Sequence, residues 1–448
     1  MNSSRVSEMC IAARGLPGPR VVGRVSAVVG MKLTASGISG AVGIGSRCRV
    51  TTTGGTAMDG EVVGVDATGV HVLPFGTWDG IGPGAAVEVV PGGASLRPGP
   101  GWIGRVVDPL GTPLDGRGPL PLGPERSVRA APPPPAFDRR EVGARIGTGI
   151  KALDVFAPLC RGQRMGIFAG SGVGKSTLMS ILARRAEADV IVVGLVGERG
   201  REVQDFIRNA LGPEGMARSV IVAATGDTAP LMRRQAAATA TAVAEALRDR
   251  GMHVLLMIDS VTRFAQAQRE IGLSLGEPPA ARGYPPTVFA ELPQLLERSG
   301  PGAEGQGDIT ALYTVLVDGD DMNDPVADSV RGILDGHLIL SRRVAERGRY
   351  PAVDLERSLS RMLPDCHDAA ENAVLGAVRS AIGRYADIEE LVRIGAYQTG
   401  TDPETDQAIA IAEATERYLA QPREEAVSVD DAFAGLTEIL RAAGHPAV

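Results

Sequence analysis

The sequence predicts an α/β protein in three parts: a small antiparallel β-barrel, a parallel β-sheet covered by helices, and a C-terminal helical domain. Three observations lead to this prediction. Valine-rich runs broken by glycine fill residues 21–92, apolar β-type runs alternate with helical runs in the middle, and only helical runs follow residue 366. At 448 residues, 44% of them apolar, the chain is long enough for two or three domains with separate cores.

The barrel is predicted from short apolar runs at spacings typical of antiparallel strands. The runs are VVGRVSAVV, SRCRVTTT, GEVVGVDATGVHVLPFG and AAVEVV. Glycine and aspartate between them indicate turns. An irregular glycine-rich lobe is the alternative interpretation. Residues 1–20 form a short arm in which Gly15, Pro17, Gly18 and Pro19 disfavour an amphipathic helix.

Residues 93–142 are rich in proline and glycine and end in AAPPPP. Such a segment is typical of an extended connector, because proline cannot donate to a sheet and interrupts helices. We therefore expect a domain boundary near residue 142.

Residues 143–365 alternate between the two kinds of secondary structure. RMGIFAG precedes STLMSILARRAE, DVIVVGLVG precedes REVQDFIRNAL, and HVLLMIDS follows an alanine-rich helical run over 230–250. Uniformly apolar strands are typical of a parallel sheet with helices on both faces. Residues 366–448 contain four amphipathic helical runs: DAAENAVLGAVRSAIGRY, DIEELVRIG, DQAIAIAEATERYLA and SVDDAFAGLTEILRAA.

Composition and charge disfavour several classes of protein. The net charge is −7 and aromatic residues make up 4% of the chain, so we expect no nucleic-acid partner. The four cysteines are far apart and indicate reduced thiols in a cytoplasmic protein, without a zinc site. The N-terminus lacks the apolar core of a signal peptide, and no apolar run reaches membrane-spanning length. We expect a soluble protein with at most peripheral membrane contact.

A phosphate-binding loop is the strongest local motif. It matches the P-loop spacing except for alanine in place of the first glycine. Lys175 is expected to contact the β- and γ-phosphates of ATP or ADP, and the Ser176 hydroxyl to bind Mg²⁺. The loop consists of Ala169, Gly170, Ser171, Gly172, Val173, Gly174, Lys175, Ser176 and Thr177.

Two carboxylates follow apolar runs near this loop in the predicted sheet. Asp259 ends the run that begins at Val254, which is where a Mg²⁺-binding carboxylate lies in P-loop proteins. Glu198 ends the run that begins at Asp189 and could polarise the attacking water. The charged segment GERGRE could equally be a solvated turn, and spacing alone leaves both interpretations of Glu198 open.

Several blocks together resemble the family of hexameric ATPases that includes the catalytic subunits of rotary ATP synthases. The segment PAVDLERSLS (351–360) fits the family signature, and GRVVDPLGTPLDGRGPL (104–120) resembles its linker segment. Within the family, blocks such as VGERGREVQDFI and VLVDGDDMNDPVADSVRGILDGHLILSRR are most similar to the export ATPases of type III secretion. The resemblance implies a RecA-like P-loop core.

The resemblance also assigns roles to individual residues. Glu198 corresponds to the catalytic glutamate, and Arg199 to an arginine on the phosphate side. Arg361 corresponds to an arginine supplied in trans to a neighbour's γ-phosphate, with an ordinary interface ion pair as the alternative. Tyr350 corresponds to the ring that stacks on adenine. Tyr418 corresponds to a second wall of the adenine pocket, with core packing as the alternative.

The activity implied is ATP hydrolysis by a homohexamer that energises flagellar protein export. The implied partners are a stator-like regulator, a central coiled-coil stalk, the export gate of the inner membrane, and chaperone–substrate complexes. The irregular N-terminal arm puts regulator and lipid binding by that arm in doubt. The alternatives are a virulence-type injectisome ATPase, an RNA-translocating helicase ring and a rotary ATP synthase subunit.

Overall fold

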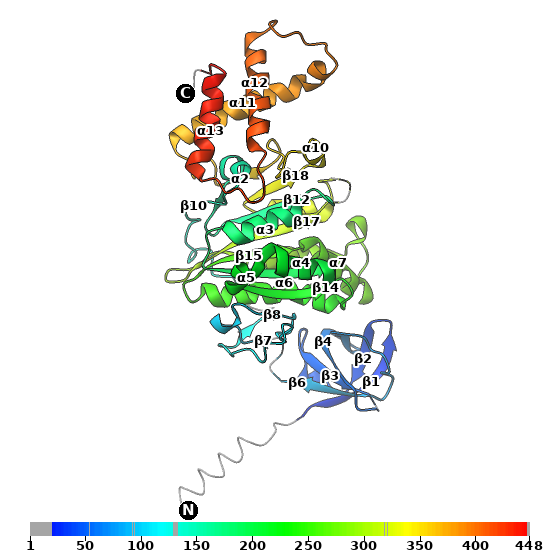
Figure 1. The fold of residues 1–448 in the computed structure, drawn as a ribbon. Helices are drawn as coiled ribbons and strands as arrows, with labels where there is room; N and C mark the ends of the chain where they lie inside the picture. Colours follow the sequence, from blue (N-terminus) through cyan, green and yellow to red (C-terminus); the bar gives the residue numbers. More distant parts are fainter. Residues whose placement is uncertain are drawn as a thin grey trace, which may run out of the picture. The chain divides into compact units, whose positions relative to one another are not determined.

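The computed structural model describes residues 20–445, except for 53, 92, 94, 129–132, 318 and 320 (Figure 1). The described residues up to Ser95, with Ala229–Leu231 and Leu273–Glu277, form one compact unit, and the remainder form a second. The predicted N-terminal arm lies outside the described residues, apart from Arg20. Among the helices in the described ranges, none is both long enough and apolar enough to cross a membrane.

The first unit contains the predicted barrel. Six strands close in the order β1-β2-β5-β4-β3-β6, and all neighbours are antiparallel. Successive side chains of a strand point alternately into and out of the barrel. In β3, Cys48 and Val50 are therefore buried whereas Arg49 is exposed. The strands are β1 (Val22–Val29), β2 (Lys32–Ser36), β3 (Arg47–Thr51), β4 (Ala57–Asp66), β5 (Gly69–Pro74) and β6 (Ala86–Val90).

A nine-stranded sheet forms the centre of the second unit. Its order is β19-β18-β12-β17-β15-β13-β14-β8, with β16 paired to β17. All pairs are parallel except those made by β16 and β19. The strands are β8 (Val106–Val107), β12 (Arg164–Ala169), β13 (Val190–Glu198), β14 (Ser219–Thr225), β15 (His253–Asp259), β16 (Gly300–Pro301), β17 (Asp308–Leu316), β18 (Gly336–Leu340) and β19 (Leu359–Ser360).

Helices cover both faces of this sheet, so its strands are apolar on both sides. In β13, Ile191 and Val193 contribute to the core that contains α2 and α3, whereas Val190 and Val192 contribute to the core that contains α6 to α9. The helices are α2 (Lys151–Phe156), α3 (Lys175–Arg185), α4 (Gly200–Asp205), the π-helical η3 (Phe206–Leu211), α5 (Gly212–Ala217), α6 (Pro230–Arg248), α7 (Val261–Ser274), α8 (Pro286–Leu296), α9 (Pro325–Ile333) and α10 (Arg342–Glu346).

The segment expected to be an extended connector packs on the second unit for part of its length. β8 adds to the edge of the sheet beside β14. Trp102 is buried, and its indole N–H donates to the carbonyl of Pro121 at 3.1 Å. The remaining short strands are β7 (Ser95–Leu96), β9 (Arg126–Ser127), β10 (Arg145–Ile146) and β11 (Leu159–Cys160).

Three helices follow in the described residues after the sheet: α11 (Ala369–Arg393), α12 (Pro403–Leu419) and α13 (Val429–Ala442). Asp368 and Glu371 form a capping box at the start of α11. Two runs expected as separate helices are joined in α11, because neither glycine nor proline interrupts Tyr385 to Asp387. The predicted fold class is confirmed: a barrel, a parallel sheet between helices, and a C-terminal group of helices.

Candidate active site

The glycine-rich loop joins β12 to α3, and two of its glycines have left-handed backbone conformations. Gly172 and Gly174 have φ values of 79° and 94°, which favour glycine over other residues. α3 begins at Lys175, immediately after Gly174. The unpaired N–H groups of a first helical turn are suited to bind phosphate oxygens. Ala169, which replaces the first glycine of the motif, ends β12 inside the sheet and is 1% exposed.

Lys175 points toward two carboxylates that end neighbouring strands. Its Nζ forms an ion pair with Oδ1 of Asp259, at the end of β15. The same Nζ lies 3.9 Å from Oε1 of Glu198, at the end of β13. β13 and β15 are adjacent and parallel, so their carboxyl ends meet at one edge of the sheet. The two predicted carboxylates and the lysine therefore lie together.

Glu198 is not a solvated turn residue. Its side chain is 15% exposed and faces Lys175. Burial is the largest influence and raises the pKa of Glu198 to about 8; the negative charge of Asp259 and a hydrogen bond with Glu202 act in the same direction, while Lys175 opposes them. A carboxyl group with such a pKa is suited to exchange protons near neutral pH.

A cavity of about 160 Å³ lies beside these groups. The predicted residues Ser176, Thr177, Glu198 and Asp259 line it. Arg199 does not, because its side chain is 87% exposed and pairs with Glu202 at 3.1 Å. The full lining is Ser176, Thr177, Ser180, Arg184, Leu195, Glu198, Glu202, Val203, Asp205, Phe206, Asn209, Ala210, Asp259 and Arg423.

The ring of Tyr350 lies beside the phosphate loop. A Cβ atom on Gly174 would be 3.5 Å from two ring carbons of Tyr350, and the side chain is 46% exposed. The carbonyl of Tyr350 accepts the N–H of Gln421 at 2.8 Å. The side chain of Gln421 in turn bonds the N–H of Lys151 and the carbonyl of Gly149. A segment after α12 thus fixes the backbone that carries this exposed ring.

Tyr418 is held by contacts within the helical part of the chain and with α2. Its hydroxyl donates to the carbonyls of Asp431 and Ala432 at 3.0 and 3.2 Å. The Nζ of Lys151 lies 4.5 Å from the centre of its ring. The ring also packs closely on Gly435, where a Cβ atom would approach within 2.3 Å. These contacts are the kind that the core-packing alternative predicts.

Arg361 lies at the other end of the sheet from the phosphate loop. Its N–H donates to the carbonyl of Asp335, and the N–H of Asp335 donates to the carbonyl of Arg164, where β12 begins. The phosphate loop follows the last residue of β12, Ala169. A six-residue parallel strand spans roughly 20 Å. Arg361 is exposed and cannot reach the phosphate loop of its own chain.

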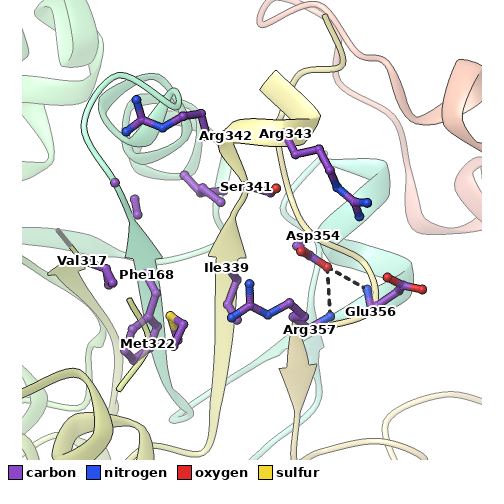
Figure 2. A pocket seen from close by; sticks show the side chains of 13 residues that line it. Phe168, Val317, Met322, Ile339, Ser341, Arg342, Arg343, Asp354, Glu356 and Arg357 are labelled. Carbon is purple, nitrogen blue, oxygen red and sulfur yellow. Dashed lines mark hydrogen bonds between the residues drawn. The ribbon is translucent and has the colours of Figure 1, made fainter. Parts of the chain in front are cut away.

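A second cavity, of about 260 Å³, adjoins the first residues of the phosphate loop (Figure 2). Its floor is apolar and includes Phe168, Met322 and Ile339. Arg342 and Arg343 border it from the start of α10. The carboxylate of Asp354 accepts the N–H groups of residues 356 and 357, as the dashed lines show. Asp354 therefore stabilises a turn. This residue of the signature segment 351–360 has a structural role.

Comparison with known proteins gives two matches to family models. The model described as "ATP synthase alpha/beta family, nucleotide-binding domain" matches residues 149–360. The model described as "T3SS EscN ATPase C-terminal domain" matches residues 368–438. A protein named flagellum-specific ATP synthase, from Caulobacter vibrioides, is 49% identical over 94% of this chain and 96% of its own length.

The chain belongs to the ATP synthase alpha/beta family. This family member is an ATPase, and its relatives include proteins named flagellum-specific ATP synthase and type 3 secretion system ATPase. The type 3 secretion system ATPase of Xanthomonas euvesicatoria is 44% identical over 94% of each chain. The assembled ATPase EscN from enteropathogenic E. coli superposes on this chain with a TM-score of 0.87 and 37% identity. The match covers 93% of this chain and all of EscN. EscN in complex with its central stalk EscO gives a TM-score of 0.83 at the same identity and coverage.

The residues around Asp259 fit a magnesium ion. Asp259 is 8% exposed and lines the same cavity as the hydroxyl-bearing Ser176. Mg²⁺ in ATPases is held by one or two such protein oxygens, with phosphate oxygens and waters completing its shell. Ser176 and Asp259 would hold the ion, which supplies charge neutralisation to the phosphates when it is bound.

Several residues near the site do not appear in the sequence prediction. Glu202, Asp205 and Asn209 follow Glu198 along α4 and η3, at spacings that place polar side chains over one turn after another. Arg423 reaches the cavity from the segment between α12 and α13. Thr314 donates a hydrogen bond to Asp259. The signal available for Thr314 is a hydroxyl in the apolar run ITALYTVL, beside the predicted carboxylate strand.

Proposed function

We propose that this ATPase hydrolyses ATP to ADP and phosphate as a homohexameric ring and energises flagellum-specific type III protein export. The observation that carries the proposal is the 49% identity to a flagellum-specific ATP synthase over nearly the whole length of both chains. The match of residues 368–438 to a secretion ATPase domain adds support from the part of the chain that lies outside the nucleotide-binding domain.

The catalytic roles follow from the edge of the sheet where β12, β13 and β15 end. The N–H groups of the loop and Nζ of Lys175 bind the phosphates, and Ser176 and Asp259 bind Mg²⁺. Glu198 accepts a proton from, or orients, the attacking water. Arg199 is assigned to the phosphate side of the site, although its side chain is exposed and pairs with Glu202. Hydrolysis then requires one further positively charged group that stabilises the negative charge of the transition state.

Arg361 supplies that charge to the neighbouring protomer. Its distance from the phosphate loop of its own chain supports a role in trans, as does its exposure. A heterologous interface repeated around a closed ring would bring each Arg361 to the next phosphate loop. Tyr350 stacks on adenine in the same site, and Tyr418 supports the second wall of the adenine pocket.

The division of labour along the chain is proposed as follows. Residues 21–92 form the barrel domain, 93–142 the connector, 143–365 the ATPase domain and 366–448 the helical domain that docks chaperone–substrate complexes. A stator-like regulator, a central coiled-coil stalk and the membrane export gate are the other partners. We place the ring in the cytoplasm at the inner membrane, without nucleic acid.

An injectisome ATPase is the second candidate, supported by the Xanthomonas relative and by EscN. Deletion of the gene distinguishes the two candidates. We expect the deletion strain to lack filaments and motility, and a plasmid with the parent gene, but not with Lys175→Ala, to restore both. A fully flagellated deletion strain with impaired effector secretion would replace the flagellar proposal with the injectisome one.

Two biochemical controls address the remaining alternatives. Strong stimulation of ATP hydrolysis by poly-C would favour an RNA-translocating ring. Failure of the purified chain to form active oligomers with Mg-ATP would favour a rotary subunit, because such a subunit needs a non-identical partner.

A further inference from the structure

Thr314 occupies the strand that separates the phosphate loop from the carboxylate strand. β17 pairs with β12 on one side and with β15 on the other, both in parallel. Thr314 is fully buried near the carboxyl end of β17, where the phosphate loop and Asp259 also lie. A hydroxyl in such a position requires a hydrogen-bond partner.

The shorter of the two hydrogen bonds of Thr314 goes to Asp259, and the carbonyl of Ile258 is a second acceptor at 3.4 Å. The Thr314 hydroxyl donates to Oδ1 of Asp259 at 2.6 Å. Within the described part of the chain, the side chain of Asp259 receives hydrogen bonds from Lys175 and Thr314 only, and both go to Oδ1. Oδ2 accepts none from the described residues. The two donors therefore hold one carboxylate oxygen and leave the other for a ligand outside the chain.

The two donors differ in how firmly they are placed. Lys175 has a long side chain and is the cation that incoming phosphates attract, so its bond to Asp259 competes with nucleotide. Thr314 has a short, stiff side chain on a strand that is paired on both sides. Its hydroxyl is neutral, so phosphates exert no comparable attraction that would compete with its bond to Asp259.

We propose that Thr314 is a positioning residue that orients Asp259 for Mg²⁺. The proposal rests on the proposed metal-binding role of Asp259. Residues that orient a metal ligand commonly change metal affinity about 10- to 100-fold when they are replaced. Loss of the hydroxyl would therefore weaken the Mg²⁺-dependent part of nucleotide binding and leave the Mg²⁺-independent part unchanged.

The same strand provides a matched control. Thr310 is also fully buried, four residues earlier on the same face of β17. Its hydroxyl accepts the N–H of Gly162 and bonds Nε2 of His253, at 2.8 Å each, away from the carboxylates. Replacing either threonine by valine removes a buried hydroxyl of the same kind, but only Thr314→Val removes one from Asp259.

The test is calorimetric titration of the full-length protein with ADP over a series of free Mg²⁺ concentrations, and in excess EDTA. For Thr314→Val we expect an increase of about tenfold in the Mg²⁺ concentration that gives half-maximal enhancement of ADP binding. ADP affinity in EDTA should match that of the parent. Thr314→Ser, which keeps the hydroxyl, should restore most of the Mg²⁺ dependence, and Thr310→Val should retain it.

The outcomes separate this inference from the assignment beneath it. A parent-like Mg²⁺ curve for Thr314→Val, or an equal shift for Thr310→Val, would overturn the role of Thr314 alone. Parent protein whose ADP binding ignores Mg²⁺ would overturn the metal assignment and the inference with it. If Thr314→Val fails to fold, Thr314→Ala and Thr314→Ser decide the question by the same titration.

Discussion

The ammonium group of Lys175 is paired with the carboxylate of Asp259. Both side chains are nearly buried, at 13% and 11% exposure. The proposed phosphate-binding cation and the proposed metal-binding anion thus neutralise each other. Because an unpaired buried charge is costly, each group needs the other until a nucleotide and its metal replace the contact.

Replacing Lys175 by alanine should abolish ATP hydrolysis and retain the fold. Loss of a positioned charge at the phosphates is expected to lower kcat at least about 100-fold. Asp259 keeps its bond to Thr314, so the loss of stability should be partial. Steady-state phosphate release and circular dichroism measure the two effects. Lys32→Ala, a charge removal in the barrel, serves as the control, and normal turnover by Lys175→Ala would refute the phosphate-loop assignment.

Replacing Glu198 by glutamine should allow nucleotide binding but slow cleavage by about 10² to 10⁴. The amide keeps the shape of the side chain and removes its capacity to accept a proton. Single-turnover cleavage, with ADP binding measured in parallel, separates the two effects. Glu202→Gln, a neighbouring carboxylate change in the same cavity, should slow cleavage much less. An unchanged rate for Glu198→Gln would mean that another group activates the water.

The raised pKa of Glu198 predicts a pH dependence. Below a pKa of about 8 the carboxyl group is protonated, so kcat/KM should rise with pH, about tenfold per unit, and level off near pH 8. Lys175, Asp259 and Glu202 are the charged groups that face it. Glu202→Gln removes one influence that raises the pKa and should move this rise to lower pH. A profile that is flat from pH 6 to 8 would contradict the assignment.

The same shift affects stability with a definite sign. The folded pKa lies above the ordinary value of 4.5, so the folded state binds more protons than the unfolded state between the two values. The contribution of Glu198 to the free energy of unfolding therefore falls as pH rises from about 4.5 to 8. Denaturant titrations of the parent and of Glu198→Gln should converge at low pH and diverge toward pH 8.

Replacing Tyr350 by alanine should weaken ATP binding and leave the chemical step largely intact. Stacking of a base on an aromatic ring contributes about 1–3 kcal/mol, so the KM for ATP should rise about tenfold or more. Tyr350→Phe keeps the ring and should behave like the parent. Affinity for inorganic tripolyphosphate, which has no base, should not change. An equal loss of affinity for both ligands would indicate damage to the phosphate loop instead.

Mixing two inactive variants should restore activity if Arg361 acts in trans. Rings of Lys175→Ala and Arg361→Ala protomers contain sites with an intact phosphate loop beside an intact Arg361, about a quarter of the interfaces in a random equal mixture. Alone, Lys175→Ala should lower kcat at least about 100-fold, and Arg361→Ala about 10³-fold or more. Mass photometry establishes that mixed rings form. No rescue in proven mixed rings would argue for an ordinary interface ion pair.

The parts of the site that could be predicted from sequence are those in which the functional residues and the local backbone structure are specified by the same short segment. The spacing from Ala169 to Thr177 specifies a strand, a tight turn and a helix start, and Asp259 terminates an apolar run. Both features are local, so a single sequence is sufficient to recognise them.

Contacts between distant segments could not be predicted in the same way. Thr314 and Asp259 are 55 residues apart, and their contact depends on which strands are neighbours in the sheet. Gln421 contacts Tyr350 and Gly149 through the packing of the helical segment, which the amphipathic pattern leaves open. The predicted alternation of strands and helices establishes a parallel sheet but not the order of its strands.

The placement of Arg361 at the opposite end of the sheet from the phosphate loop has a consequence for where and when the cell's ATP is hydrolysed. In the proposed ring, a lone subunit carries halves of two different catalytic centres and completes neither. Newly synthesised or detached subunits would therefore not hydrolyse ATP. On dilution, the ATPase activity per milligram of protein would fall steeply because the rings dissociate. ATP hydrolysis would then begin only where subunits assemble into a ring, which in the proposed function is at the inner membrane where export takes place.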